Sequence, residues 1–125
     1  MLTPDLRFRI PIDGVIIMIK PKWLALILAG VKTLEIRPVP CRQYIGRTIY
    51  LCESGSKQVH ATARLADVSD ELSEQAWISL RAAHQVPGNR MYKKTYAWSL
   101  ADVKPCDPFI PIARKQGSVG IQIGP

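Results

Sequence analysis

Gly30-Val31-Lys32-Thr33-Leu34-Glu35-Ile36-Arg37 places a lysine, a threonine, a carboxylate and an arginine within six consecutive residues. If residues 33–37 form a strand, its period of two points Thr33, Glu35 and Arg37 to one face and the two apolar residues between them to the other. Lys32 lies at the turn that leads into this strand, and its long stem can reach the same face. Such a set of donors beside an acceptor suits an anionic or strongly hydrogen-bonding ligand.

The residues before this stretch predict a strand followed by a helix. Val15–Lys20 is a continuous apolar run rich in β-branched residues, which is typical of a buried strand. Pro21 suits the first position of a helix. Apolar residues then recur at helical spacing up to Ala29, and Gly30 is a natural C-terminal stop.

The residues after it predict further short strands and a second helix. Alternating or β-branched runs predict strands at Thr48–Cys52, Val59–Leu65, Thr95–Val103 and Ser118–Ile123. The second helix is expected from about Asp70 or Glu71 to His84, with Ser69 or Asp70 as its N-cap and with Leu72, Ala76, Leu80 and Ala83 on its inner face.

Prolines and tryptophans refine this outline. Pro105, Pro108 and Pro111 predict an irregular connection before the last strand, and Trp23 and Trp77 are expected in the core. Many short strands with few helical crossovers favour an α+β fold built on a small mixed β-barrel over a doubly wound sheet.

Size, charge and cysteines limit the possible classes of protein. The 125 residues are expected to form one domain, 14–125, after an N-terminal leader at 1–13. The net charge of +7 and the pI near 9.6 favour a polyanionic partner such as RNA or a nucleotide. Three cysteines without a C-x-x-C pair argue against a disulfide framework and a zinc site. We expect no metal and no cofactor.

The sequence shows no targeting signal. Its apolar runs are shorter than the ~20 residues that a membrane-spanning helix needs. A cytoplasmic protein that does not enter a membrane is therefore the default expectation, and the oligomeric state stays open.

The pattern G-x-K-x-x-E-x-R after an apolar helix resembles the signature of the ASCH domain family, which belongs to the PUA-like superfamily. Here it consists of Gly30, Lys32, Glu35 and Arg37, preceded by Ile19-Lys20-Pro21-Lys22-Trp23. The segment Pro111–Gly117 is also similar to one found in some members. The resemblance implies a PUA-like β-barrel of five to six strands with two to three flanking helices and a cleft beside the motif.

The resemblance also implies a choice of functions. The family is associated with RNA binding, some small members are amidohydrolases that deacylate N4-acetylcytidine, and one has been described as a ribonuclease. In the amidohydrolases a lysine, a threonine and a glutamate act together. Lys32 matches the lysine, Glu35 stands in the threonine's slot, and Glu71 and Glu74 are candidates for the glutamate by region only.

Eight residues are candidates for the site. Lys32 and Glu35 are the candidates for catalysis: a desolvated lysine can act as a base or nucleophile, and a glutamate can accept from a base amino group such as cytosine N4. The candidates for binding RNA or a nucleoside are Thr33, Arg37, Tyr44, Trp98, Arg114 and Lys115. A structural ion pair among Glu35, Arg37 and Lys32 is the alternative explanation of the motif.

The leading interpretation is a binding protein for RNA or a modified nucleoside with a basic cleft around this motif. The alternatives are an amidohydrolase acting on N4-acetylcytidine-type nucleosides, a ribonuclease, and a protein-interaction module whose basic surface binds an acidic partner.

Overall fold

The computed structural model describes residues 9–115 and 120–125. Its strands are β1 (Val15–Ile19), β2 (Leu34–Arg37), β3 (Thr48–Glu53), β4 (Gln58–Val68), β5 (Tyr96–Pro111) and β6 (Ile121–Ile123). Its helices are α1 (Pro21–Leu28), α2 (Glu74–Ser79) and α3 (Arg81–His84), with a 3-10 turn, η2, at Arg42–Tyr44. None of the described helices is long and apolar enough to cross a membrane.

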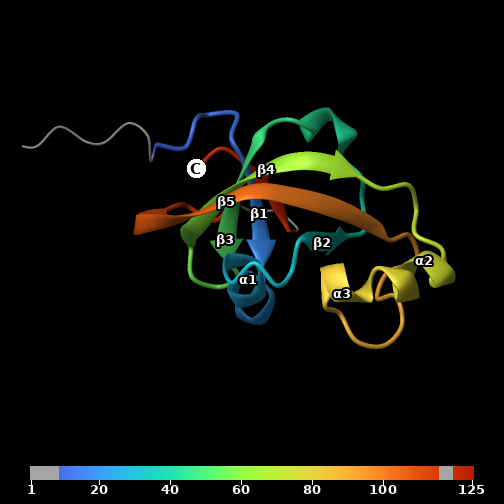
Figure 1. The fold of residues 1–125 in the computed structure, drawn as a ribbon. Helices are drawn as coiled ribbons and strands as arrows, with labels where there is room; N and C mark the ends of the chain where they lie inside the picture. The colour runs from blue at the N-terminus through green and yellow to red at the C-terminus, as the bar shows by residue number, and fades with distance from the viewer. Residues whose placement is uncertain (1–8, 116–119) are drawn as a thin grey trace, which may run out of the picture.

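All six strands form one curled sheet in the order β2-β5-β4-β3-β1-β6 (Figure 1). Only the β1–β3 pair is parallel, and the other four pairs are antiparallel. Irregularities in the register between β4 and β5 and between β3 and β4 bend the strands, because a bulge increases local twist. The predicted class, a small mixed barrel-like sheet with flanking helices, is confirmed.

The first helix forms where the sequence predicts it. Pro21 opens α1 at a position where the missing N–H is not needed, and the Ala29 N–H closes its last turn on the Ala25 carbonyl. Gly30 then takes a φ of +76°, which an L side chain rarely adopts. Leu24 and Ile27 face the main core, where they pack among the inward residues of β1, β3 and β4.

The expected irregular connection at the prolines is wrong, because β5 continues as a strand to Pro111. Pro105 pairs with Ala61 and Pro111 with Gln58 along β4. The other neighbour, β2, pairs only with the first part of β5, from Tyr96 to Ser99. The second half of β5 therefore has an edge without a sheet partner among the described strands, where a proline removes no ladder hydrogen bond.

The second helix is also different from the prediction. It begins later, with Ser73 as its N-cap, whose hydroxyl accepts from the Ala76 N–H, and it breaks at Leu80 into α2 and α3. Its buried face carries Trp77 and His84, whose rings stack 3.9 Å apart between centroids. Three members of the expected inner face, Leu72, Ala76 and Leu80, pack in the same apolar cluster as Trp77. The pair of helices lies beside β2, which α3 contacts (Figure 1).

The ends of the chain are described in part. Residues 1–8 of the expected leader and residues 118–119 of the expected last strand lie outside the described residues, as do residues 116–117 of the segment 111–117, which is similar to one in some ASCH members. Ile10 is buried in a second apolar cluster with Ile16, Val59 and Ile112.

Candidate functional site

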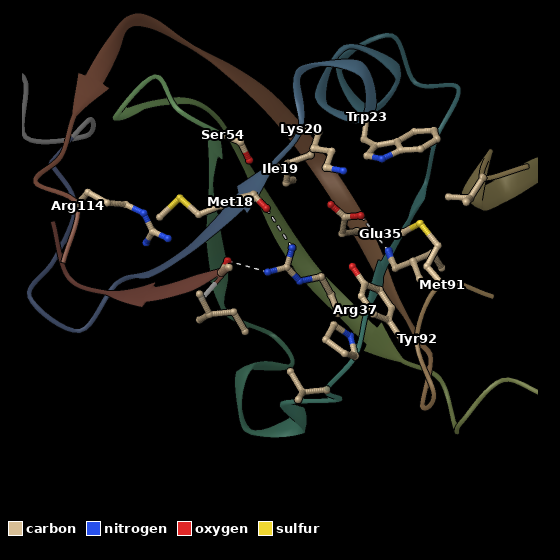
Figure 2. A pocket seen from close by; sticks show the side chains of 16 residues that line it. Met18, Ile19, Lys20, Trp23, Glu35, Arg37, Ser54, Met91, Tyr92 and Arg114 are labelled. Carbon is tan, nitrogen blue, oxygen red and sulfur yellow. Dashed lines mark hydrogen bonds between the residues drawn. The ribbon is translucent and has the colours of Figure 1, made fainter. Parts of the chain in front are cut away.

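A pocket lies at the seam where the curled sheet does not close. The two edges of the sheet are β2 and β6. The pocket between them, called the seam pocket below, has a volume of about 410 Å³. Its lining comes from β1, β2 and β6 with the residues next to them (Met18, Ile19, Lys20, Trp23, Glu35, Ile36, Arg37, Pro38, Val39, Gly120 and Ile121) and from Ser54, Val86, Met91, Tyr92 and Arg114 (Figure 2).

Strand β2 supplies two of the pocket's charged side chains by its alternation. Glu35 and Arg37 line the pocket, as the period of two predicts. The alternate residues Leu34 and Ile36 pack with Trp77 in the apolar cluster under α2 and α3, and Ile36 also borders the pocket. Thr33, which was expected on the polar face, precedes the strand and is exposed outside the pocket.

Arg37 joins the two edges of the sheet. Its Nη1 donates to the Met18 carbonyl at 3.1 Å, and its Nη2 donates to the Gly120 carbonyl at 2.7 Å (Figure 2). The guanidinium thus spans the seam from β2 to β1 and the start of β6, which the fork of an arginine can do and a lysine cannot. Its Nε is buried and makes no hydrogen bond to a described residue, which is uncommon for a buried donor.

Lys32 lies behind Glu35 with no exposed side-chain surface. Its Nζ donates to the His84 carbonyl at 2.6 Å and to the Leu34 carbonyl at 2.8 Å. It also lies 3.9 Å from Glu35 Oε1. Burial lowers the pKa of Lys32, and the negative charge of Glu35 partly opposes this shift.

Glu35 is the carboxyl group of the pocket. Burial raises the pKa of Glu35, while the positive charges of Lys32 and Arg37 and a hydrogen bond from the Ile36 N–H act in the opposite direction. Its side chain is 6% exposed, whereas that of Lys32 is fully buried. Of the two residues predicted for catalysis, Glu35 is therefore the one that can contact a ligand in the pocket.

Residues that the sequence analysis did not select complete the rim. Trp23 was expected in the core, and it is there only in part: it is half-buried against two apolar clusters and also lines the pocket. Lys20 and Tyr92 line it from the start of α1 and from the loop before β5 (Figure 2). Lys20 and Trp23 belong to the segment 19–23, which carries part of the resemblance to the ASCH family and could have pointed to them. No feature of the sequence pointed to Tyr92.

Of the remaining candidates, only Arg114 joins the pocket. Trp98 is fully buried, its Nε1 donates to the Val39 carbonyl, and its ring lies 5.9 Å from the Arg37 guanidinium carbon. Tyr44 packs against the main core with Arg47 over its ring. The Lys115 Nζ donates to the Ile123 carbonyl beside the end of β6. These three residues lie outside the lining of the seam pocket.

Comparisons with known proteins agree with this fold. A family model described as the ASCH domain matches residues 17–109. A crystal structure of an ASCH protein from Zymomonas mobilis has a TM-score of 0.63 at 19% identity, over 76% of this chain and 71% of that one. A serine-to-alanine mutant of that protein has a TM-score of 0.69 at 19% identity, over 90% and 88% of the two chains. A search of curated proteins finds no match.

Proposed function

Because this chain belongs to the ASCH domain family, we propose that it binds RNA, through an unpaired base, in the seam pocket around Lys32, Glu35 and Arg37. The proposal includes a free nucleoside as a weaker ligand of the same pocket. The pocket's volume of about 410 Å³ falls within the range of roughly 300–1,000 Å³ that is usual for small-ligand sites.

The observation that carries the proposal is a buried carboxyl group facing a cavity with aromatic and cationic walls. Glu35 offers the acceptor that a base amino group such as cytosine N4 requires. Trp23 and Tyr92 are half-buried aromatic residues of the lining, and an unpaired base stacks on such side chains. Lys20 and Arg114 add positive charge for a phosphate backbone.

Lys32 acts in this proposal as a positioning residue. Its ammonium donates to two backbone carbonyls and stands beside Glu35 without reaching the pocket surface. A buried carboxylate is strongly disfavoured unless a positive charge is near, so Lys32 helps Glu35 to ionise. The motif then combines a structural ion pair with a ligand-binding role.

The pH dependence of RNA binding tests the role of Glu35. Above its raised pKa Glu35 is a carboxylate and accepts a hydrogen bond, and below it the group is protonated and loses this role. We therefore expect affinity for short single-stranded RNA to fall as the pH is lowered, beginning at a pH above the ordinary range of a glutamate. If Glu35 had no role, acidification would instead strengthen RNA binding, because it makes the protein more positive.

The variant Glu35→Gln keeps the shape of the side chain but removes its titration. We expect Glu35→Gln to bind about 5–50-fold more weakly at neutral pH, equivalent to about 1–2.3 kcal/mol, and to lose the acid-side decline. Fluorescence anisotropy with labelled RNA between pH 5 and 8 measures both effects. If the unmodified protein and Glu35→Gln had the same affinity and the same pH profile, Glu35 would not be part of the binding site.

One observation favours an amidohydrolase as the second candidate. A carboxyl group with a raised pKa can transfer a proton near neutral pH. In hydrolysis of N4-acetylcytidine, water would attack the acetyl carbon, the C–N bond would break, and Glu35 would pass the water's proton to the departing nitrogen, giving cytidine and acetate. Release of cytidine, followed by chromatography and lost in Glu35→Gln, would support this activity. Undiminished turnover by Glu35→Gln would exclude the proposed role of Glu35.

A further inference from the structure

A second, smaller hollow adjoins the seam pocket. It has a volume of about 150 Å³ and is lined by Met18, Cys52, Ser54, Gly55, Lys57 and Arg114. Met18, Ser54 and Arg114 line both cavities, so the two lie next to each other on one side of the seam. Figure 2 shows Met18, Ser54 and Arg114 together on the side of the pocket opposite Tyr92 and Met91.

The adjoining hollow has a different chemistry from the seam pocket. Its lining contains two cationic residues, Lys57 and Arg114, and no acidic residue, whereas the seam pocket contains Glu35. The charge of Arg114 acts on the Cys52 thiol, where it opposes the rise in pKa that burial causes. Arg114 is itself a lining residue of the hollow, so its positive charge lies at the wall.

The turn between β3 and β4 presents Lys57 to this hollow. Gly55 and Lys57 both take positive φ angles, +84° and +55°, and the Ser56 hydroxyl holds the turn by donating to the Glu53 carbonyl and accepting from the Gln58 N–H. The Lys57 side chain is exposed, while its carbonyl accepts from the Ile112 N–H. The backbone on both sides of Lys57 is therefore fixed, and its ammonium is accessible to solvent.

We propose that the adjoining hollow is a phosphate subsite for the nucleotide whose base occupies the seam pocket, with Lys57 and Arg114 as its cations. The inference rests on the proposed function and makes it narrower: the ligand is a phosphorylated strand, and a nucleoside alone leaves the subsite empty. A volume of 150 Å³ is below the usual range for an organic ligand, roughly 300–1,000 Å³, and so disfavours a second base there.

The test compares Lys57 with a matched lysine elsewhere. Arg114 lines both cavities and cannot separate them, but Lys57 lines only the hollow. Lys104, an exposed residue of β5, lines neither cavity and serves as the control. Lys57→Asn introduces a residue that tolerates the positive φ of this position, and Lys57→Ala introduces no new polar group. An effect that both variants share is therefore due to the lost ammonium and not to a folding defect in one of them.

Affinity for a short single-stranded RNA is measured at several salt concentrations for each variant. Loss of one phosphate contact is expected to reduce the slope of log affinity against log salt by about 1 in both Lys57 variants, and Lys104→Ala should keep a slope closer to that of the unmodified protein. If RNA binds but both Lys57 variants match Lys104→Ala, the subsite is wrong and the proposed function stands. If the unmodified protein binds no RNA, both proposals fail.

A second measurement separates a phosphodiester subsite from a general anion site. Cytidine, cytidine 5′-monophosphate, cytidine 3′-monophosphate and inorganic phosphate are each titrated into the protein. We expect at least one monophosphate to bind about tenfold more tightly than cytidine, with the gain lost in Lys57→Asn. Inorganic phosphate binding as tightly as the monophosphates would contradict the coupling of the two cavities.

Discussion

Replacing Lys32 by methionine is expected to lower the free energy of unfolding by about 3–5 kcal/mol, the usual effect of removing one partner from a buried ion pair. The change leaves the buried Glu35 without the positive charge, 3.9 Å away, that favours its carboxylate. It also leaves the His84 carbonyl without the donor that bonds it at 2.6 Å. Urea denaturation followed by tryptophan fluorescence measures the loss.

Two further variants show whether the ion pair causes this effect. Lys104→Met changes an exposed lysine in the same way and is expected to shift the free energy of unfolding by less than about 0.5 kcal/mol. Adding Glu35→Gln to Lys32→Met removes the unpaired charge and should recover part of the stability. A Lys32→Met protein as stable as Lys104→Met would contradict the buried pair.

Replacing Arg37 by methionine is expected to loosen the seam and to lower the free energy of unfolding by about 2–4 kcal/mol, since hydrogen bonds from charged groups contribute about 1.5–3 kcal/mol each. The variant loses the bonds to the carbonyls of Met18 and Gly120. It also raises the pKa of Glu35 further, because Arg37 favours the carboxylate. Hydrogen exchange of the amides in β2 and β6 should become faster than in β3 and β4.

Two controls accompany this experiment. Arg64→Met removes an exposed arginine that pairs with Asp102, so its effect should stay below about 1 kcal/mol. Gly120→Ala acts on the same bond from the other side, because Gly120 has a φ of +75° and an added Cβ would lie 2.9 Å from Arg37 Nη2. Unchanged exchange in β6 of Arg37→Met would mean that Arg37 does not hold the seam.

Period-two alternation predicted the central geometry of the site. The residues from Leu34 to Arg37 largely obey it: Glu35 and Arg37 reach the pocket, and Leu34 and Ile36 reach an apolar cluster, although Ile36 also borders the pocket. The start of the chain was equally predictable, because Pro21 and Gly30 mark the limits of a helix with local chemistry. Sequence patterns are sufficient to predict a structure where the residues that determine it lie within a few positions of one another.

The parts that were not predicted depend on distant partners. Lys32 can be buried because the His84 carbonyl, 52 residues away in sequence, accepts a hydrogen bond from its ammonium. Arg37 is fixed by Gly120, which lies 83 residues away. The prolines of β5 fit a strand only because β2 is too short to pair with that part of it. Trp23 was expected in the core alone, because the sequence could not show that the tertiary arrangement also brings it to the pocket that Glu35 lines.

An NMR titration of the isotope-labelled protein with a short single-stranded RNA tests most directly whether the seam pocket receives an unpaired base. The account predicts that the largest shift changes fall on the Trp23 indole, the Tyr92 ring and the amides of Glu35 to Arg37, and that Glu35→Gln weakens them. If these resonances do not shift, whether RNA binds on another surface or does not bind at all, the proposed binding of a base in the seam pocket is contradicted.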